Sequence, residues 1–188
     1  PELRHPRIDL ISASGHKIYG PKGVGVLVVR HRGKHKVPLA PLTFGGGQEH
    51  GLRPGTLPVP LIVGLGKAAE MAGKDHAARE QKCRSFRERF LQAMSPLQPK
   101  IHGEEGQVLP HTVNASFPGL SAEEVMLRGK DLVAVSNGSA CTSASFQPSH
   151  VLKAMHLGKD EIIGAVRFSW CHLTPEPDWP MLVAKLRG

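Results

Sequence analysis

Lys17 is the first residue of this chain whose type and setting could support chemistry. It lies in the stretch SASGHKIYGPKG, residues 12–23. A lysine that forms a Schiff base must lie near a carbonyl and be able to lose its proton, and a partly desolvated, cation-rich turn lowers the cost of that loss. Ser14 and His16 could face the same pocket, because glycines let the backbone approach a bulky ligand. An ordinary glycine-rich hairpin with an exposed lysine explains the segment equally well.

Cys141 is the second candidate, surrounded by serine, glycine and alanine in SNGSACTSAS, residues 136–145. Such small neighbours do not bury a thiol in a core, whereas Cys83 lies on the apolar side of an expected helix. A thiol with the ordinary pKa of about 8.5 is only a few per cent thiolate at neutral pH. An exposed loop suits a thiol that moves between substrate and acceptor, so we interpret Cys141 as reactive and Cys83 and Cys171 as structural.

Arg167 is the third candidate, in the apolar run GAVRFSW, residues 164–170. A buried arginine needs a partner, and a carboxylate is its best bidentate match. That partner is either a structural carboxylate, such as a glutamate, or the carboxylate of an amino-acid substrate. The residues alone favour the structural partner.

Short strands and helices alternate along the chain and must position these residues. Apolar patterns predict strands at 8–12, 24–29, 112–117, 132–135 and 165–169. Helices are expected at 58–71, 76–94, 121–128, 148–156 and 178–187, with a turn opening at 160–163. This alternation indicates an α/β or α+β layer. A change of composition at 72–75 predicts a domain boundary, which gives domains 1–74 and 75–188.

Composition narrows the classes of partner. Lys+Arg is 24 against Asp+Glu 16, a net charge of +8 that favours anionic partners. The basic run at 30–36 is interpreted as a solvated loop, and with only 5% aromatic residues direct nucleic-acid binding is not expected. No run approaches the roughly 20 apolar residues of a membrane span.

The cysteines and the first residues bear on location. Three cysteines without a CxxC motif favour a reducing, cytoplasmic compartment and argue against a closed zinc site. The opening PELRHPRIDL has no Met and no secretory signal. We therefore expect a fragment that lacks an N-terminal part, which leaves a targeting segment open.

Four ordered motifs carry a resemblance to a known family. They are SGHKIYGPKGVGVL, FGGGQEHGLRPGT, SNGSACTSASFQPSHVL and AVRFS. Together they resemble the cysteine desulfurases of the fold-type I, class V aminotransferase family, in the branch that supplies sulfur for iron–sulfur clusters, nitrogen fixation or DNA phosphorothioation. The match covers the chain from about Ile8 and corresponds to the C-terminal half of such an enzyme. It implies an α/β fold in which the C-terminal part of the large pyridoxal-phosphate domain, 1–74, precedes a smaller α+β C-terminal domain, 75–188.

The resemblance implies a role for each candidate. Lys17 resembles the lysine that bonds to pyridoxal 5'-phosphate and then acts as a base, with His16 counted among the catalytic residues. Ser14 and His16 resemble ligands on the phosphate side. Thr56 resembles the residue that reaches the phosphate of the neighbouring subunit in a homodimer. Cys141 resembles the nucleophile that takes sulfur as a persulfide, and Arg167 the clamp on the substrate α-carboxylate.

Substrate and partners follow from the same resemblance. The substrate is L-cysteine, alanine is released, and the persulfide passes to a sulfur-acceptor protein. No resident metal is implied, although Cys141 is a candidate transient ligand of an iron–sulfur cluster. Two rival hypotheses stay open: a selenocysteine lyase of the same fold, and a non-catalytic basic binding fragment.

Two departures from the family pattern occur. Pro54 stands where the family often has serine, and Trp170-Cys171 stands where Leu-Gly usually follows the last motif. In such enzymes the other half supplies an aspartate at the pyridine nitrogen, a histidine on the ring and part of the phosphate cup. The 188 residues alone are therefore expected to be inactive.

Overall fold

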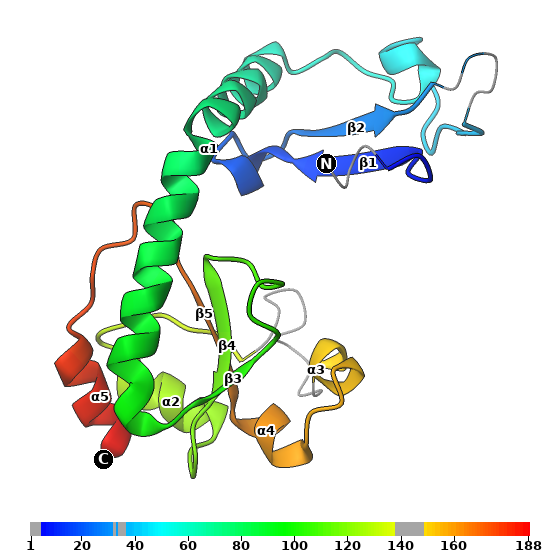
Figure 1. The fold of residues 1–188 in the computed structure, drawn as a ribbon. Helices are drawn as coiled ribbons and strands as arrows, with labels where there is room; N and C mark the ends of the chain where they lie inside the picture. Colours follow the sequence, from blue (N-terminus) through cyan, green and yellow to red (C-terminus); the bar gives the residue numbers. More distant parts are fainter. Residues whose placement is uncertain (1–4, 32, 34–36, 138–148) are drawn as a thin grey trace. The chain divides into compact units, whose positions relative to one another are not determined.

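A computed structural model describes residues 5–31, 33, 37–137 and 149–188 (Figure 1). They fall into two compact units, Pro1–His76 (unit 1) and Ala77–Gly188 (unit 2). Cys141 lies outside the described residues. Within the described ranges, no helix combines the length and apolar composition that crossing a membrane requires.

Unit 1 contains an antiparallel pair of strands, β1 (Leu10–Ser14) and β2 (Gly25–Val29). A 3-10 helix, η2 (Gly15–Ile18), follows β1 directly, and a second, η3 (Glu49–Gly51), lies further along the chain. Both strands were predicted, but β1 begins two residues later than expected. The carbonyl of Asp9 instead accepts a hydrogen bond from the Arg30 amide at 2.9 Å, just beyond the paired strands.

Helix α1 runs without interruption from Val59 to Met94. The prediction of two helices separated at 72–75 is wrong. Gly73 is the only poor helix former in that interval, and one interior glycine costs only about 1 kcal/mol relative to alanine. That cost does not break a helix of 36 residues, and the boundary between the units falls inside α1.

Unit 2 is built on a three-stranded antiparallel sheet with the order β3-β4-β5. The strands are β3 (Lys100–His102), β4 (Thr112–Ser116) and β5 (Ala165–Ser169). The strand predicted at 165–169 is confirmed, and the one at 112–117 is confirmed apart from its last residue. A short 3-10 helix, η4 (Ser95–Leu97), joins α1 to β3.

Four helices complete unit 2: α2 (Ala122–Gly129), α3 (His150–Ala154), α4 (Lys159–Gly164) and α5 (Trp179–Arg187). The predicted capping box of α2 is confirmed, because the Glu124 amide donates to Ser121 Oγ at 3.2 Å and the Ser121 amide donates to Glu124 Oε2 at 2.8 Å. Figure 1 shows α2 and α5 beside the C-terminal part of α1.

The core of unit 2 lies between the sheet and helices α1, α2 and α5. Its most deeply buried side chains come from α1, β4, α2, β5 and α5: Phe90, Met94, Val113, Val125, Val166, Leu182 and Leu186. Burial of apolar surface on this scale is the main favourable term for the unit.

Two further differences from expectation concern strands. Residues 132–135 form no strand, although Leu132, Val133 and Val135 pack against the core as predicted. Their apolar character reflects burial rather than ladder pairing, since only the next residue, Ser136, makes an isolated bridge. The short strand β3 was not predicted, because its three residues are too few to show alternation.

The contact between α1 and the Lys17 segment gives a testable prediction. A Cβ at Gly64 would lie 2.6 Å from Pro21 Cγ, whereas one at Gly66 would meet nothing within 4 Å. Gly66→Ala should therefore stabilise unit 1 by about 0.5–1 kcal/mol through helix propensity. Gly64→Ala should destabilise it by about 1–3 kcal/mol, because the proline ring must shift.

Hydrogen exchange at the Gly20 amide, which donates to the Gly15 carbonyl at 2.9 Å, measures both effects. Exchange should slow in Gly66→Ala and quicken in Gly64→Ala. A change of the same sign in the two variants would contradict the tight contact.

Candidate functional site

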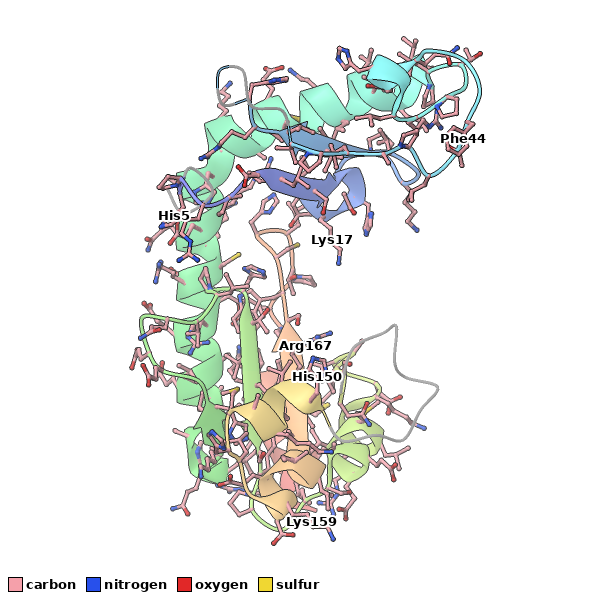
Figure 2. All side chains as sticks on the ribbon, turned by 90° about the vertical axis from the view of Figure 1, so that its right-hand side faces the viewer. His5, Lys17, Phe44, His150, Lys159 and Arg167 are labelled. Carbon is pink, nitrogen blue, oxygen red and sulfur yellow. The ribbon has the colours of Figure 1, made fainter. Side chains whose placement is uncertain are left out.

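The Lys17 segment is a short turn between two paired strands. Ser14 ends β1, Gly15 opens η2, and His16 and Lys17 lie within that helix. The side chains of Ser14, His16 and Lys17 are exposed, and Figure 2 shows Lys17 extending away from its ribbon. The described residues of unit 1 therefore do not supply the partial desolvation expected around Lys17.

The backbone around Lys17 is held on both sides. The Gly15 amide donates to the Val24 carbonyl at 2.9 Å. Gly25 of β2 pairs with Ser14 at the end of β1. A Cβ on Gly25 would lie 2.7 Å from the Ala13 carbonyl oxygen. No side chain fits there, so glycine permits the two strands to meet at the turn. The result is a fixed backbone that carries an exposed amine.

Thr56 is the other predicted phosphate ligand in unit 1. It is exposed and follows Gly55, whose φ of 105° requires glycine and whose amide donates to Gln48 Oε1 at 3.1 Å. Pro54, which stands where the family often has serine, lies two residues before the exposed Thr56. Ser14 makes no side-chain hydrogen bond to cap η2, so its hydroxyl is not used within that turn.

The chemistry of these side chains fits pyridoxal phosphate. Ser14 and Thr56 offer hydroxyl donors, His16 an imidazole, and Lys17 an amine, all of them exposed. Hydroxyl and imidazole donors suit a phosphate, and a lysine amine is the group that condenses with an aldehyde.

Arg167 lies in the middle of β5 in unit 2. Its neighbours Val166 and Phe168 are buried, whereas Arg167 is exposed on the opposite face. Its amide donates to the Ser136 carbonyl at 2.6 Å, and its carbonyl accepts from the Ser136 amide at 3.2 Å. Among the residues described, no carboxylate pairs with its guanidinium, so the interpretation favouring a structural glutamate partner gains no support.

The sequence also missed a buried polar pair beside the sheet. His102 is only 6% exposed, and its Nε2 lies 2.7 Å from Ser116 Oγ. Ser116 Oγ donates in turn to the Glu161 carbonyl at 2.7 Å. The alternation of polar and apolar residues in β4 was the signal that could have indicated a polar face here.

The charge state of His102 follows from its burial. Burial lowers the pKa of His102, Lys100 lowers it further, and Glu161 opposes both. The Glu161 carboxylate pairs with Lys100 and accepts from the Gly158 amide, and these bonds hold its pKa below the usual value. His102 is therefore a neutral ring at physiological pH.

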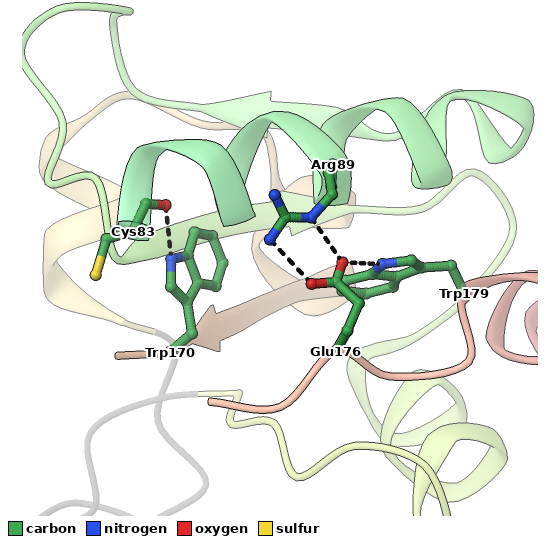
Figure 3. Close-up of polar contacts among 5 residues, drawn as sticks. All are labelled: Cys83, Arg89, Trp170, Glu176 and Trp179. Carbon is green, nitrogen blue, oxygen red and sulfur yellow. Dashed lines mark hydrogen bonds and ion pairs between the residues drawn. The ribbon is translucent and has the colours of Figure 1, made fainter. Parts of the chain in front are cut away.

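The unusual Trp170 that follows the last motif packs against α1. Its indole Nε1 donates to the Cys83 carbonyl at 3.1 Å (Figure 3). The centroids of the Trp170 and Phe86 rings lie 5.0 Å apart. Trp170 is buried, so this departure from the family pattern, three residues after Arg167, contributes to the core. The expected structural role of Cys83 agrees with its burial, which raises the pKa of its thiol.

An ion pair lies next to this tryptophan. Arg89 donates two hydrogen bonds of 3.0 Å to the two oxygens of Glu176, and Trp179 Nε1 donates to the same carboxylate at 2.6 Å (Figure 3). The Arg89 bond is the main reason that the pKa of Glu176 is lowered. Because both side chains are about half exposed, the pair stabilises unit 2 by only about 0–1 kcal/mol.

A cavity of about 400 Å³ lies beside these residues. Its lining is mostly apolar and includes Phe86, Phe90, Phe168, Trp170 and Trp179. None of the predicted site residues that the structure describes lines this cavity.

A family model, aminotransferase class-V, matches residues 2–178. The chain belongs to the aminotransferase class-V family. This membership confirms the predicted fold class, and named cysteine desulfurases among the relatives confirm the resemblance carried by the four motifs.

Three class-V relatives illustrate the similarity. A protein named cysteine desulfurase IscS, from Rickettsia massiliae (strain Mtu5), is 47% identical over 173 residues, which are 91% of this chain and 42% of the relative. The crystal structure of DndA from Streptomyces lividans matches with a TM-score of 0.71 and 42% identity, over 87% of this chain and 47% of that one. The structure of SspA in complex with cysteine matches with a TM-score of 0.64 and 39% identity, over 86% and 44% respectively. The chain thus spans less than half the length of these class-V relatives.

The buried His102 should make the stability of unit 2 depend on pH. Its folded pKa lies below the ordinary value of 6.5, so the unfolded chain binds more protons as the pH falls through that value. The contribution to stability is fully present above about pH 6.5 and is lost progressively below it. His102→Gln, which keeps a donor for Ser116, should remove this loss.

Urea unfolding of unit 2 followed by tryptophan fluorescence, between pH 7.5 and 5, is the measurement. The acidic groups with lowered pKa values, such as Glu161, act only at lower pH. If the free energy of unfolding of His102→Gln fell with decreasing pH as steeply as that of the original chain, another group would be responsible for the pH dependence.

Proposed function

We propose that the protein to which this chain belongs is a pyridoxal-phosphate-dependent cysteine desulfurase that takes sulfur from L-cysteine as an enzyme persulfide and releases alanine. The observation that carries the proposal is 47% identity over 173 residues to a relative named cysteine desulfurase. The fixed backbone and exposed amine at Lys17 support it, and so does the related SspA, whose structure is in complex with cysteine.

Residues of unit 1 hold the cofactor in this proposal. Lys17 bonds to it, and Ser14 and His16 bind its phosphate. When bound, pyridoxal phosphate withdraws electrons from the substrate Cα and so makes its proton removable. The Lys17 amine, released from the cofactor when the amino group of the substrate takes its place, would take that proton.

Residues of unit 2 act on the substrate. The Arg167 guanidinium binds the α-carboxylate as a bidentate donor. The Cys141 thiolate attacks the sulfur of the substrate, so that an S–S bond forms while the substrate Cβ–S bond breaks. The electron pair of that bond stays with the carbon fragment, which takes up one proton at Cβ, regains one at Cα from Lys17 and leaves as alanine. The sulfur remains on Cys141 and passes to a thiolate of an acceptor protein.

The assembly is part of the same proposal. Unit 1 is the C-terminal part of the large cofactor-binding domain, and unit 2 is the small domain that carries Cys141. Thr56 donates to the cofactor phosphate of a second subunit, which makes the enzyme a homodimer with an isologous interface. We place the enzyme in the cytoplasm, a reducing compartment, because three cysteines without a CxxC motif do not suggest the disulfide framework of a secreted chain.

Lys17 gives the direct test of cofactor attachment. Borohydride reduction of the full-length, cofactor-loaded protein followed by peptide mapping should leave one pyridoxyl group on Lys17. Lys22, in the same loop and also exposed, is the internal control and should carry none. A label on Lys22 in place of Lys17 would overturn the assignment.

Cys141 gives the test of sulfur transfer. Cys141→Ala should reduce persulfide formation and delivery at least a hundredfold, because no other thiol is proposed to attack the substrate sulfur. Cofactor absorbance should be unchanged, since the cofactor ligands belong to unit 1. Cys171→Ala serves as the matched control and should keep normal transfer. Normal sulfide release by Cys141→Ala would favour the selenocysteine-lyase-type alternative.

A further inference from the structure

Strand β4 has two chemically different faces. Val113 and Ala115 point into the core and are 2% and 0% exposed. Thr112, Asn114 and Ser116 lie on the other face, because successive residues of a strand alternate. This polar face is shared with Arg167 of β5, which pairs directly with Asn114.

The pairing of Asn114 with Arg167 is of the close type. Both the amide and the carbonyl of Arg167 bond to Ser136, on the side away from β4. Asn114 and Arg167 therefore form a non-hydrogen-bonded antiparallel pair, and in such pairs the Cα atoms are only about 4.5 Å apart and the side chains lie closer. The Trp170 amide bonds to the His111 carbonyl, at 3.1 Å, as this alternation requires.

Asn114 lacks a partner for its acceptor. Its Oδ1 is buried and makes no hydrogen bond with the described residues. The neighbour on β3, His102, cannot supply a donor, because Ser116 Oγ donates to Glu161 and must accept from His102 Nε2. The remaining ring nitrogen, Nδ1, is then an acceptor, and it is also buried without a described partner.

Arg167 is the cross-strand neighbour that can donate. A guanidinium has five N–H donors in a fixed fork, and a bidentate carboxylate uses only two. No side-chain acceptor among the described residues occupies the remaining donors of Arg167. One of them can therefore bond to Asn114 Oδ1 while the fork receives a carboxylate.

We propose that Asn114 is a positioning residue, whose side-chain oxygen orients the Arg167 guanidinium for the carboxylate of the substrate. The inference rests on the proposed function only in taking Arg167 as the carboxylate ligand. Asn114 does not touch the substrate; it removes rotational freedom from the arginine before the substrate binds. An oriented arginine loses less freedom on binding, and the carboxylate is held more tightly.

The test uses the full-length, cofactor-loaded enzyme with Asn114→Leu, which has similar volume and no acceptor. The KM for L-cysteine should rise about tenfold while kcat changes less than twofold. Calorimetric titration should show about tenfold weaker binding of L-alanine and unchanged binding of ethylamine, which lacks the carboxylate. Thr112→Val, on the same face of β4 and opposite Ser169, is the control and should change neither value.

The Arg167→Gln variant separates the role proposed for Arg167 from the role proposed for Asn114. Arg167→Gln should weaken L-alanine binding strongly, and adding Asn114→Leu to it should cause no further loss. If Arg167→Gln leaves L-alanine binding unchanged, the role proposed for Arg167 is wrong. If Arg167→Gln weakens binding but Asn114→Leu does not, or if the two losses multiply, the positioning role is wrong while that of Arg167 stands. Should Asn114→Leu fail to fold, Asn114→Ser, whose hydroxyl is too short to reach the guanidinium, takes its place with the same expected results.

Discussion

The alternation of residues in β4 is the constraint on which unit 2 depends. One set of its side chains fills the core between the sheet, α1 and α5, and the other set lies on the face that Arg167 shares. A slip of β4 by one residue against its neighbouring strands would exchange the two sets. The buried side chains Val113 and Val166 therefore fix the register, and the register sets Asn114 opposite Arg167. Core packing and the chemistry of the polar face are consequences of a single pairing.

Unit 1 has a different kind of support. Adjacent residues of β2, Val26 to Val28, are all 45–51% exposed, so both faces of the β1–β2 pair are open. Two-stranded sheets are marginally stable in isolation. The described contacts that hold the Lys17 segment are short backbone hydrogen bonds and the meeting of Pro21 with Gly64 of α1. Apolar faces of this kind are suited to packing against further protein, and the match to this chain covers less than half of the relatives' own length.

Sequence patterns predicted the parts of this fold that are determined locally. The strand at 165–169 shows clear alternation, and Ser121 with Glu124 forms the predicted cap of α2. The break expected at 72–75 failed because a change of composition marked a boundary between compact units, while the helix itself continued through it. The strand predicted at 132–135 was wrong because a run of apolar residues without periodicity indicates burial but does not show whether the backbone pairs with another strand.

The candidate site divides in the same way. Motif resemblance named Lys17, Thr56 and Arg167, and the structure supplies their backbone settings and exposure. The role that we propose for Asn114 was missed because it depends on the cross-strand neighbour on β5, a pairing that local patterns in the sequence do not specify.

The order of strands has a consequence for how unit 2 folds. β3 and β4 are close in sequence and can meet by closing a short loop, whereas β5 joins β4 only after some 50 intervening residues have been accommodated. Loop closure over that distance carries a larger entropic cost and raises the contact order. We therefore expect the strand that carries Arg167 to dock last of the three, and the segment that it closes includes Cys141. A chain at that stage would have the β3–β4 hairpin and the α2 cap, but Arg167 would not yet lie opposite Asn114. The arginine side of the polar face therefore forms with the final folding step rather than before it.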